Sequence, residues 1–198
     1  MTAARSAFAP AVLASQASFR ALMEATARPG QVRPIAGPPE APSPLSIGAA
    51  TIALALVDQE TPVWLDAPLS AAPEVTAWLR FHTSAPVTDD PAQAAFAFVA
   101  DPERVPAFDA FALGSAEYPD RSTTIILLVE TFERGPSLLL EGPGIRGSQR
   151  FAAAPLPADI CDRLVANRAL FPRGADLVFV THDAVAAIPR STRVACGG

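Results

Sequence analysis

The sequence contains no lysine, because all fifteen of its basic residues are arginine. A pyridoxal phosphate enzyme needs a lysine for its Schiff base, and a Walker-type phosphate loop needs one to reach the phosphates. The absence of lysine therefore excludes both kinds of site from this chain on its own.

Cysteine and histidine are also scarce, with two of each. Cys161 and Cys196 lie far apart and show neither a CxxC pattern nor the Cys/His spacing of a zinc site. Such cysteines are typical of a reduced cytoplasmic protein rather than of a disulfide scaffold. We therefore expect two unpaired thiols, in the core or the tail, and no metal site.

Long hydrophobic runs are missing as well, although 50% of the residues are hydrophobic. A membrane-spanning helix needs about eighteen or more apolar residues in succession. The net charge of −5 gives no basic field that would attract nucleic acid. These features predict a cytoplasmic protein without membrane or nucleic-acid partners, and the length favours one domain over residues 1–198.

The first residues, MTAARSAFAPAVLASQAS, contain an arginine, an apolar stretch and small residues, as a secretory signal does. Pro10 interrupts the apolar stretch, and apolar residues continue at helical spacing from Val12 to Met23. We interpret this segment as part of the mature protein.

Hydrophobic periodicity defines the expected helices and strands. Helices are predicted at 10–27, 46–58, 70–83, 105–114 and 157–171. Strands are predicted at 61–65, 94–99, 123–132, 136–145, 176–180 and 184–189, the last of them at a sheet edge.

The order of these elements predicts the fold class. Helices alternate with strands, and some strands follow one another across short turns such as 133–136, which indicates a three-layer α/β/α sandwich with a mixed sheet. The proline-rich segment 29–44 is expected to be a surface loop or an edge segment. In the helix at 70–83, Ser70 is the expected N-cap, and Val75 and Leu79 lie on the buried face with Trp78.

The segment GPGIRG (142–147) matches the dinucleotide-binding pattern G-x-G-x-x-G and follows a predicted strand. A dinucleotide site also needs a long helix after the glycines, whereas the sequence continues with SQRFAAAPLP, which is too short and proline-stopped. We therefore favour a tight glycine turn over a nicotinamide or flavin site. Backbone N–H groups at Gly142 and Gly144 remain available to an anion in either case.

His82 lies beside Arg80 near the end of a predicted helix. If the helix continues through His82, its side chain shares a face with Val75 and Trp78 and points toward the core, while Arg80 points away. A hydrogen-bonded histidine at a helix C-terminus is favoured over a catalytic base, because the helix dipole alone accounts for a charge there. The catalytic alternative stays open.

Two further segments contain polar side chains after predicted strands. The segment IPRSTRV (188–194) places Arg190 next to the hydroxyls of Ser191 and Thr192, which suits phosphate or phosphonate oxygens, although a solvated tail explains it equally well. His182 follows the strand at 176–180 and is expected to be a turn residue.

Six segments, in order and spacing, resemble the PhnH family of the bacterial carbon–phosphorus lyase system, from about Phe8 to Cys196. They are FRALMEATARPG (19–30), TPVWLD (61–66), LRFHTSAP (79–86), LEGPGI (140–145), FPRGADLVFV (171–180) and AIPRSTRVAC (187–196). The resemblance draws attention to Arg80, His82, Gly142, Gly144, Arg190 and Thr192 as candidate ligand-binding or subunit-contact residues, and it assigns no catalytic residue.

The resemblance implies a fold similar to the large domain of pyridoxal phosphate-dependent transferases without the cofactor site. It implies a cytoplasmic homodimer that joins PhnG, PhnI and PhnJ and works with PhnL. That assembly makes α-D-ribose 1-methylphosphonate 5-triphosphate from MgATP and an alkylphosphonate, with MgATP as a substrate and no cofactor on this chain. Two other interpretations remain: a non-catalytic dimerisation module with a vestigial cofactor cleft, and a standalone oxidoreductase that uses GPGIRG.

Overall fold

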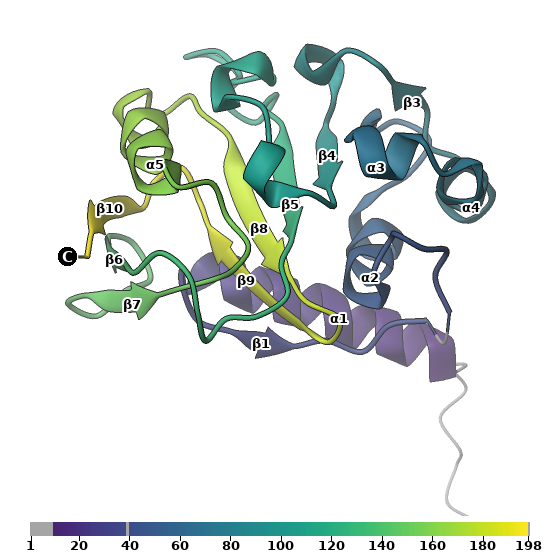
Figure 1. Cartoon of the computed structure of the whole chain (residues 1–198), viewed down its shortest axis with the longest axis horizontal. Helices are drawn as coiled ribbons and strands as arrows, with labels where there is room; N and C mark the ends of the chain where they lie inside the picture. Colours follow the sequence, from purple (N-terminus) through teal and green to yellow (C-terminus); the bar gives the residue numbers. More distant parts are fainter. Residues whose placement is uncertain (1–9, 39, 198) are drawn as a thin grey trace, which may run out of the picture.

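The computed structural model describes residues 10–38 and 40–197 (Figure 1). The α-helices are α1 (Pro10–Ala27), α2 (Ile47–Leu56), α3 (Ala67–Ser70), α4 (Pro73–Thr83) and α5 (Ile160–Ala169). The strands are β1 (Arg33–Pro34), β2 (Val63–Leu65), β3 (Val87–Thr88), β4 (Phe96–Val99), β5 (Thr124–Leu128), β6 (Leu138–Glu141), β7 (Gln149–Phe151), β8 (Asp176–Val180), β9 (Ala184–Ile188) and β10 (Arg193–Cys196). Three 3₁₀ turns lie at Pro91–Gln93, Pro102–Arg104 and Phe108–Ala110 in the described part of the chain.

The main sheet has seven strands in the order β1-β9-β8-β5-β4-β2-β3. The five strands from β8 to β3 are parallel to one another, whereas β9 is antiparallel to β8 and β1 is antiparallel to β9. The sheet is therefore mixed, and the predicted α/β class with a mixed sheet is confirmed.

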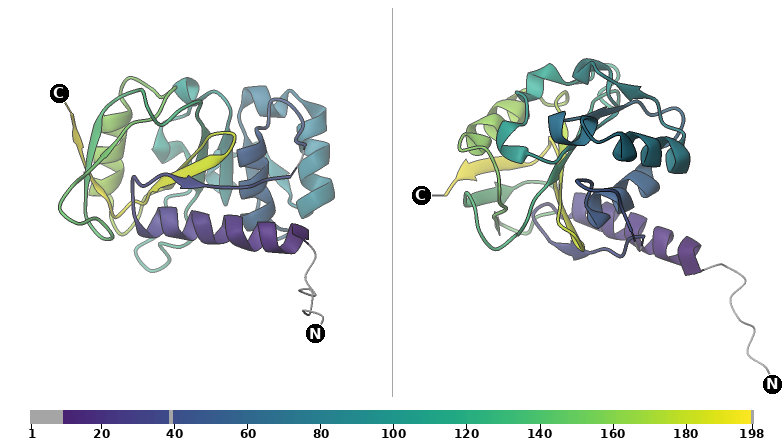
Figure 2. Two further views of the ribbon diagram at one scale, coloured as in Figure 1. Left: turned by 90° about the horizontal axis from the view of Figure 1, so that it is seen from below. Right: turned by 45° about the vertical axis from the view of Figure 1, so that its right-hand side comes forward.

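Both faces of the main sheet are covered, because side chains alternate along its strands. Phe98, Ile126 and Val178 pack with the helices α1 to α4 on one face. Their neighbours Val99 and Leu127 pack on the other face with α5 and a second, smaller sheet. Figure 2 shows these layers from two further directions.

The smaller sheet has three strands in the order β10-β6-β7, all antiparallel. It was not predicted, since β7 and β10 carried no clear strand pattern and 188–194 was open to interpretation as a solvated tail. The strands on either side of the turn at 133–136 consequently belong to different sheets.

The prediction of two free thiols is wrong, because the chain forms a disulfide. Cys161 in the first turn of α5 and Cys196 at the end of β10 form a disulfide, with their Cα atoms 5.8 Å apart. Cys161 is buried and Cys196 is exposed. The two residues are far apart in sequence, and only the packing of α5 against β10 brings them together.

The helix predicted at 70–83 is two helices with a different start. Asp66 caps α3 through its carboxylate, which accepts from the backbone N–H of Leu69, and α4 begins at Pro73. Ser70 ends α3 and caps nothing, so the predicted cap is wrong. The buried face of α4 is as expected, with Val75 and Leu79 both fully buried.

The segment 105–114 is irregular apart from the 3₁₀ turn, so the predicted short helix is wrong. Val105 precedes a proline and has a ψ of 133°, and Ala107 has a ψ of 144°, so the backbone is not helical before Phe108. The guanidinium of Arg163 donates to the carbonyls of Val105 and Pro106, at 2.9 and 3.3 Å. The predicted edge strand at 184–189 is also wrong in its position. It forms β9, which lies between β8 and β1, and the proline-rich segment supplies the edge strand β1 instead.

The predicted helix at 10–27 is confirmed by α1. The part of the mature-protein interpretation that concerns residues 1–9 lies outside the described residues. Within the described residues, none of the helices combines the length and the hydropathy that a bilayer crossing requires.

Candidate functional site

Arg80 and His82 lie at the end of α4, where Ser84 adopts a left-handed conformation and its backbone N–H donates to the carbonyl of Arg80. Both side chains are exposed, so the predicted inward direction of His82 is wrong while the outward direction of Arg80 is confirmed. The imidazole instead packs against the ring of Trp78 in a tilted arrangement, with the centroids 4.5 Å apart and an angle of 42° between the ring planes.

Phe81 adds an aromatic ring to this group that the sequence analysis missed. Its side chain is 83% exposed, and its ring lies edge-on to His82 at a centroid distance of 4.9 Å. We call Trp78, Arg80, Phe81 and His82 the aromatic helix end. Arg80, Phe81 and His82 are exposed, whereas Trp78 is partly buried against the core. An exposed group of aromatic rings and an arginine suits contact with another protein better than enclosure of a substrate.

Gly142 and Gly144 form a tight turn after β6, with the N–H of Ile145 donating to the carbonyl of Gly142 at 3.1 Å. Strand β7 follows, so the helix of a dinucleotide site is missing and the predicted glycine turn is confirmed. A Cβ at Gly144 would lie 2.0 Å from the carbonyl oxygen of Ala27 at the end of α1. Close packing against α1 thus requires glycine here.

Arg190 is committed to contacts within the chain. Its Nε and Nη2 donate to the two carboxylate oxygens of Asp176, at 3.1 and 2.5 Å, and its Nη1 donates to the carbonyl of Pro119 at 2.5 Å. Its backbone N–H also donates to Asp176, at 2.8 Å. With its guanidinium fork engaged in this way, Arg190 fastens the β9–β10 connection to the start of β8.

Thr192 is buried, and its hydroxyl has no hydrogen-bond partner among the described residues. Its backbone N–H donates to the carbonyl of Pro189, which closes the turn between β9 and β10. Its Cα lies against Gly142, 3.7 Å from the position that a Cβ there would take. Thr192 is therefore a packed residue of the turn.

Four of the six segments that carry the family resemblance meet at these turns. Gly30 follows α1, its N–H donates to the carbonyl of Ala187, and a Cβ on it would lie 2.7 Å from the side chain of Leu140. The contacts of Gly30, together with those of Gly144 with Ala27 and of Arg190 with Asp176, bring four family segments together. These segments are 19–30, 140–145, 171–180 and 187–196. We call this region the turn junction. Figures 1 and 2 place it near β6 and β10, at the opposite end of the molecule from α4.

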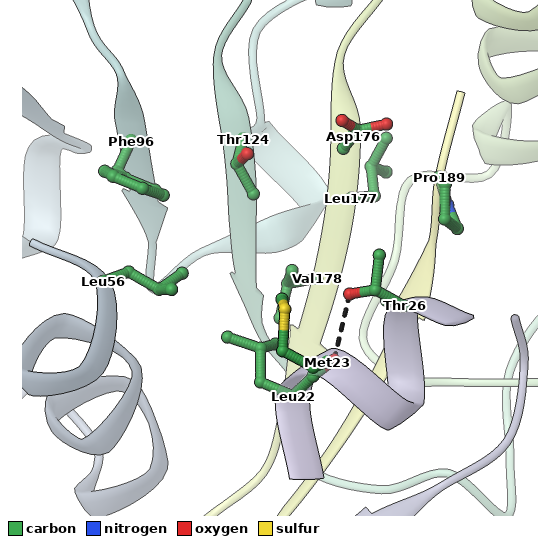
Figure 3. A pocket seen from close by; sticks show the side chains of 11 residues that line it. Leu22, Met23, Thr26, Leu56, Phe96, Thr124, Asp176, Leu177, Val178 and Pro189 are labelled. Carbon is green, nitrogen blue, oxygen red and sulfur yellow. Dashed lines mark hydrogen bonds between the residues drawn. The ribbon is translucent and has the colours of Figure 1, made fainter. Parts of the chain in front are cut away.

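A cleft of about 250 Å³ opens between α1, α2 and the first residues of β4, β5 and β8 (Figure 3). It lies at the amino ends of the parallel strands, opposite the carboxyl ends where open α/β sheets bind ligands. Its lining is mainly apolar, Asp176 is the charged residue in it, and that carboxylate is bonded to Arg190. The lining residues are Leu22, Met23, Thr26, Leu56, Phe96, Thr124, Asp176, Leu177, Val178, Ala187 and Pro189. The cleft therefore suits apolar groups rather than a triphosphate.

At the carboxyl ends of the strands, His182 is an exposed residue of the turn between β8 and β9, as predicted.

Asp66 follows β2 and was missed by the sequence analysis. It is 6% exposed, and its carboxylate accepts from the backbone N–H groups of Leu69 and Asp101, at 3.2 and 2.8 Å. Burial raises the pKa of this carboxyl above its ordinary value of 3.8, and the two backbone hydrogen bonds oppose that rise.

This raised pKa makes a testable contribution to stability. The folded chain binds the Asp66 proton more tightly than the unfolded chain, so this group lowers the free energy of unfolding as the pH rises through and above 3.8. Asp66→Asn removes the titration and keeps one acceptor oxygen. Chemical denaturation from pH 3.5 to 7 should show the variant gaining stability relative to the wild-type chain as the pH rises. A difference that is independent of pH would contradict the assignment.

Comparison with known proteins agrees with the resemblance. The family model described as bacterial phosphonate metabolism protein (PhnH) matches residues 6–195. A protein of Rhizobium meliloti (strain 1021), named alpha-D-ribose 1-methylphosphonate 5-triphosphate synthase subunit PhnH, is 45% identical over 95% of this chain and 94% of its own length. A protein of Stutzerimonas stutzeri, named putative C-P lyase subunit protein HtxG, is 35% identical over 41% of this chain and 42% of its own length. The chain belongs to the PhnH family of bacterial phosphonate metabolism proteins.

Proposed function

We propose that this chain is a non-autonomous subunit of a synthase that makes α-D-ribose 1-methylphosphonate 5-triphosphate from MgATP and an alkylphosphonate. The observation that carries the proposal is the 45% identity to the Rhizobium meliloti subunit over 95% of the chain. In this proposal MgATP is a substrate that the assembly binds, and the chain holds no cofactor of its own. The protein acts in the cytoplasm, as a homodimer that joins PhnG, PhnI and PhnJ and works with PhnL.

We also propose that the fold is similar to the large domain of pyridoxal phosphate-dependent transferases and lacks the cofactor site. The mixed α/β sheet supports this relation. The absence of lysine supports the loss of the cofactor site, because no residue is present to form the Schiff base.

The distribution of the six family segments favours a role in assembly. Four of them form the turn junction, where the side chain of Arg190 and the glycines Gly30 and Gly144 make contacts within the chain. The segment 61–66 ends in the buried carboxylate of Asp66. The segment 79–86 differs, because it presents Arg80, Phe81 and His82 on the surface. Leu79, Thr83 and Ala85 of this segment are buried and account for part of the family pattern, whereas a subunit contact at the aromatic helix end would account for its exposed residues.

The chemistry of the aromatic helix end agrees with such a contact. Exposed aromatic rings and arginines contribute most to binding at protein interfaces once they are desolvated. Arg80 and His82 lie beside Phe81, so the complementary surface on the other subunit should combine an apolar pocket with carboxylates. The occupant we propose is another subunit of the synthase, and a second copy of this chain is the alternative that the binding test separates.

Omission of the chain tests the function as a whole. Ribosyl transfer is assayed with PhnG, PhnI and PhnL, with MgATP and methylphosphonate, in the presence and absence of this protein. We expect adenine release to require the chain. Undiminished turnover without it would refute the proposed function.

Substitution of Phe81 tests the contact. Phe81→Ala should leave the melting temperature nearly unchanged, because the side chain is 83% exposed, and should weaken binding to the other subunits by roughly tenfold or more. Binding is measured by calorimetry or biolayer interferometry against each of PhnG, PhnI and PhnJ, and self-association by sedimentation. Phe171→Ala, which truncates a 51% exposed aromatic ring just after α5, is the matched control and should bind normally.

The double variant Arg80→Ala/His82→Ala separates a subunit contact from a substrate contact. Loss of assembly would support the proposed subunit contact, whereas loss of turnover in an intact assembly would give these residues contact with the substrate. If the Phe81→Ala protein binds every partner and itself with wild-type affinity, the aromatic helix end is not an interface.

A further inference from the structure

We propose that the Cys161–Cys196 disulfide is a reversible thiol–disulfide exchange site that controls whether β10 stays attached to the molecule. This goes beyond the proposed function, apart from taking its cytoplasmic location as the setting in which disulfides are reduced. In that compartment persistent disulfides are rare, and those that form are usually transient and redox-sensing.

The bond is accessible to a reducing thiol from one side. Cys196 is exposed at the end of β10, whereas Cys161 is 9% exposed in the first turn of α5. The thiolate of a dithiol reductant attacks the sulfur of Cys196, the bond between the two cysteine sulfurs breaks, and Cys161 leaves as a thiolate that takes up a proton. The second thiol of the reductant then displaces Cys196. The chain gains two electrons and two protons, and the reductant becomes a disulfide.

Without the bond, β10 is held by its backbone pairing with β6 and by its packing against α5, and few of its own side chains are buried. The strand has four residues, three of them exposed, and Val194 is only partly buried against the core. Its backbone pairs with β6, and the N–H of Gly197 donates to the carbonyl of Ser137 at 2.8 Å. The ion pair of Arg193 with Glu141 is 3.7 Å long and exposed on both sides, so it adds little.

The release is limited to this strand by contacts that the disulfide does not influence. Immediately before β10, Arg190 is fastened to Asp176 and Pro119, and Thr192 is buried. Reduction should therefore free residues 193–197 and leave the rest of the turn junction folded. It should also expose the edge of β6, because β10 is the strand that covers its outer side.

The purified full-length protein is tested in its oxidised form and after incubation with dithiothreitol under native conditions. Alkylation and mass spectrometry should show no free thiol before reduction and two after it. Hydrogen exchange should become at least tenfold faster at the amides of 193–197 and at the amides of β6 that pair with β10. It should stay unchanged at the amides of β6 that pair with β7, and in β5 and β8. The variant Cys161→Ser/Cys196→Ser should match the reduced protein with or without dithiothreitol.

Two results would overturn the proposal. One is a bond that dithiothreitol reduces only after the chain is unfolded by denaturant, which defines a purely structural disulfide. The other is full protection of β10 after reduction. If the serine variant fails to fold, the reduced and alkylated wild-type protein supplies the same comparison. None of these measurements depends on the other synthase subunits, so failure of the proposed function would leave their outcome unchanged.

Discussion

Arg190→Ala should lower the free energy of unfolding by about 3 kcal/mol, one of the two largest effects expected in this protein. The substitution removes the bidentate contact with Asp176 and the bond to the carbonyl of Pro119. Asp176 would then keep only the hydrogen bond from the backbone N–H of residue 190. Its side chain is 30% exposed, so the carboxylate would stay partly desolvated without its charged partner. Urea denaturation measures the loss, which corresponds to a fall in melting temperature of roughly 6–12 °C.

Arg193→Ala is the matched control, three residues further along the same segment. Its ion pair with Glu141 is 3.7 Å long, and the two side chains are 64% and 50% exposed, so the change should stay within about 0.5 kcal/mol. Arg190→Lys should fall between these variants, because lysine keeps the charge but lacks the fork that spans both carboxylate oxygens. Equal stability of the Arg190→Ala and Arg193→Ala proteins would show that Arg190 is free for a ligand.

The contacts of Arg190 could not be predicted from the sequence. Arginine and hydroxyls in IPRST are the groups that a phosphonate needs, so the pattern was compatible with an anion-binding edge as well as with a solvated tail. The partner that occupies Arg190 lies fourteen positions earlier, at the start of β8, and no local pattern shows that the two meet. The same holds for Gly144, whose close neighbour Ala27 belongs to the first helix. Residue chemistry predicted which groups matter, and only the fold showed what they contact.

The fold was predictable where periodicity is strong. The apolar spacing of α1, the alanine-rich α2 and the continuous apolar centres of β5 and β8 predict elements that the structure contains. Short, exposed or strained elements left no such signal. The strand β10 is largely exposed, so its sequence is equally compatible with a solvated tail. Because β10 was not predicted, the disulfide at its end was not predicted either.

His82 illustrates a different limit. Helical spacing predicted that its side chain follows Val75 and Trp78 toward the core. At the last turn of α4 the buried side of the helix has shifted to Leu79 and Thr83, so His82 lies on the outside against the ring of Trp78. The sequence did not reveal that the neighbouring Phe81 projects into solvent, and this projection is what favours a subunit contact.

Gly144→Ala should be at least as damaging as Arg190→Ala, with a loss of about 3 kcal/mol or more. A methyl group there would lie 2.0 Å from the carbonyl oxygen of Ala27, and the residue has a φ of +79°. Either the turn or the end of α1 must shift, which disturbs the junction of 19–30 with 140–145. The loss is measured by urea denaturation at neutral pH.

Gly147→Ala separates packing from backbone strain. Gly147 has a φ of +74°, close to that of Gly144, but nothing lies within 4 Å of its Cβ position. This variant should lose only about 1 kcal/mol, the cost of a left-handed conformation for alanine. The difference between the two variants therefore measures how tightly the turn packs on α1. If Gly144→Ala were as stable as Gly147→Ala and yet inactive in the reconstituted synthase, the turn would bind a ligand through its backbone, and its family pattern would be functional rather than structural.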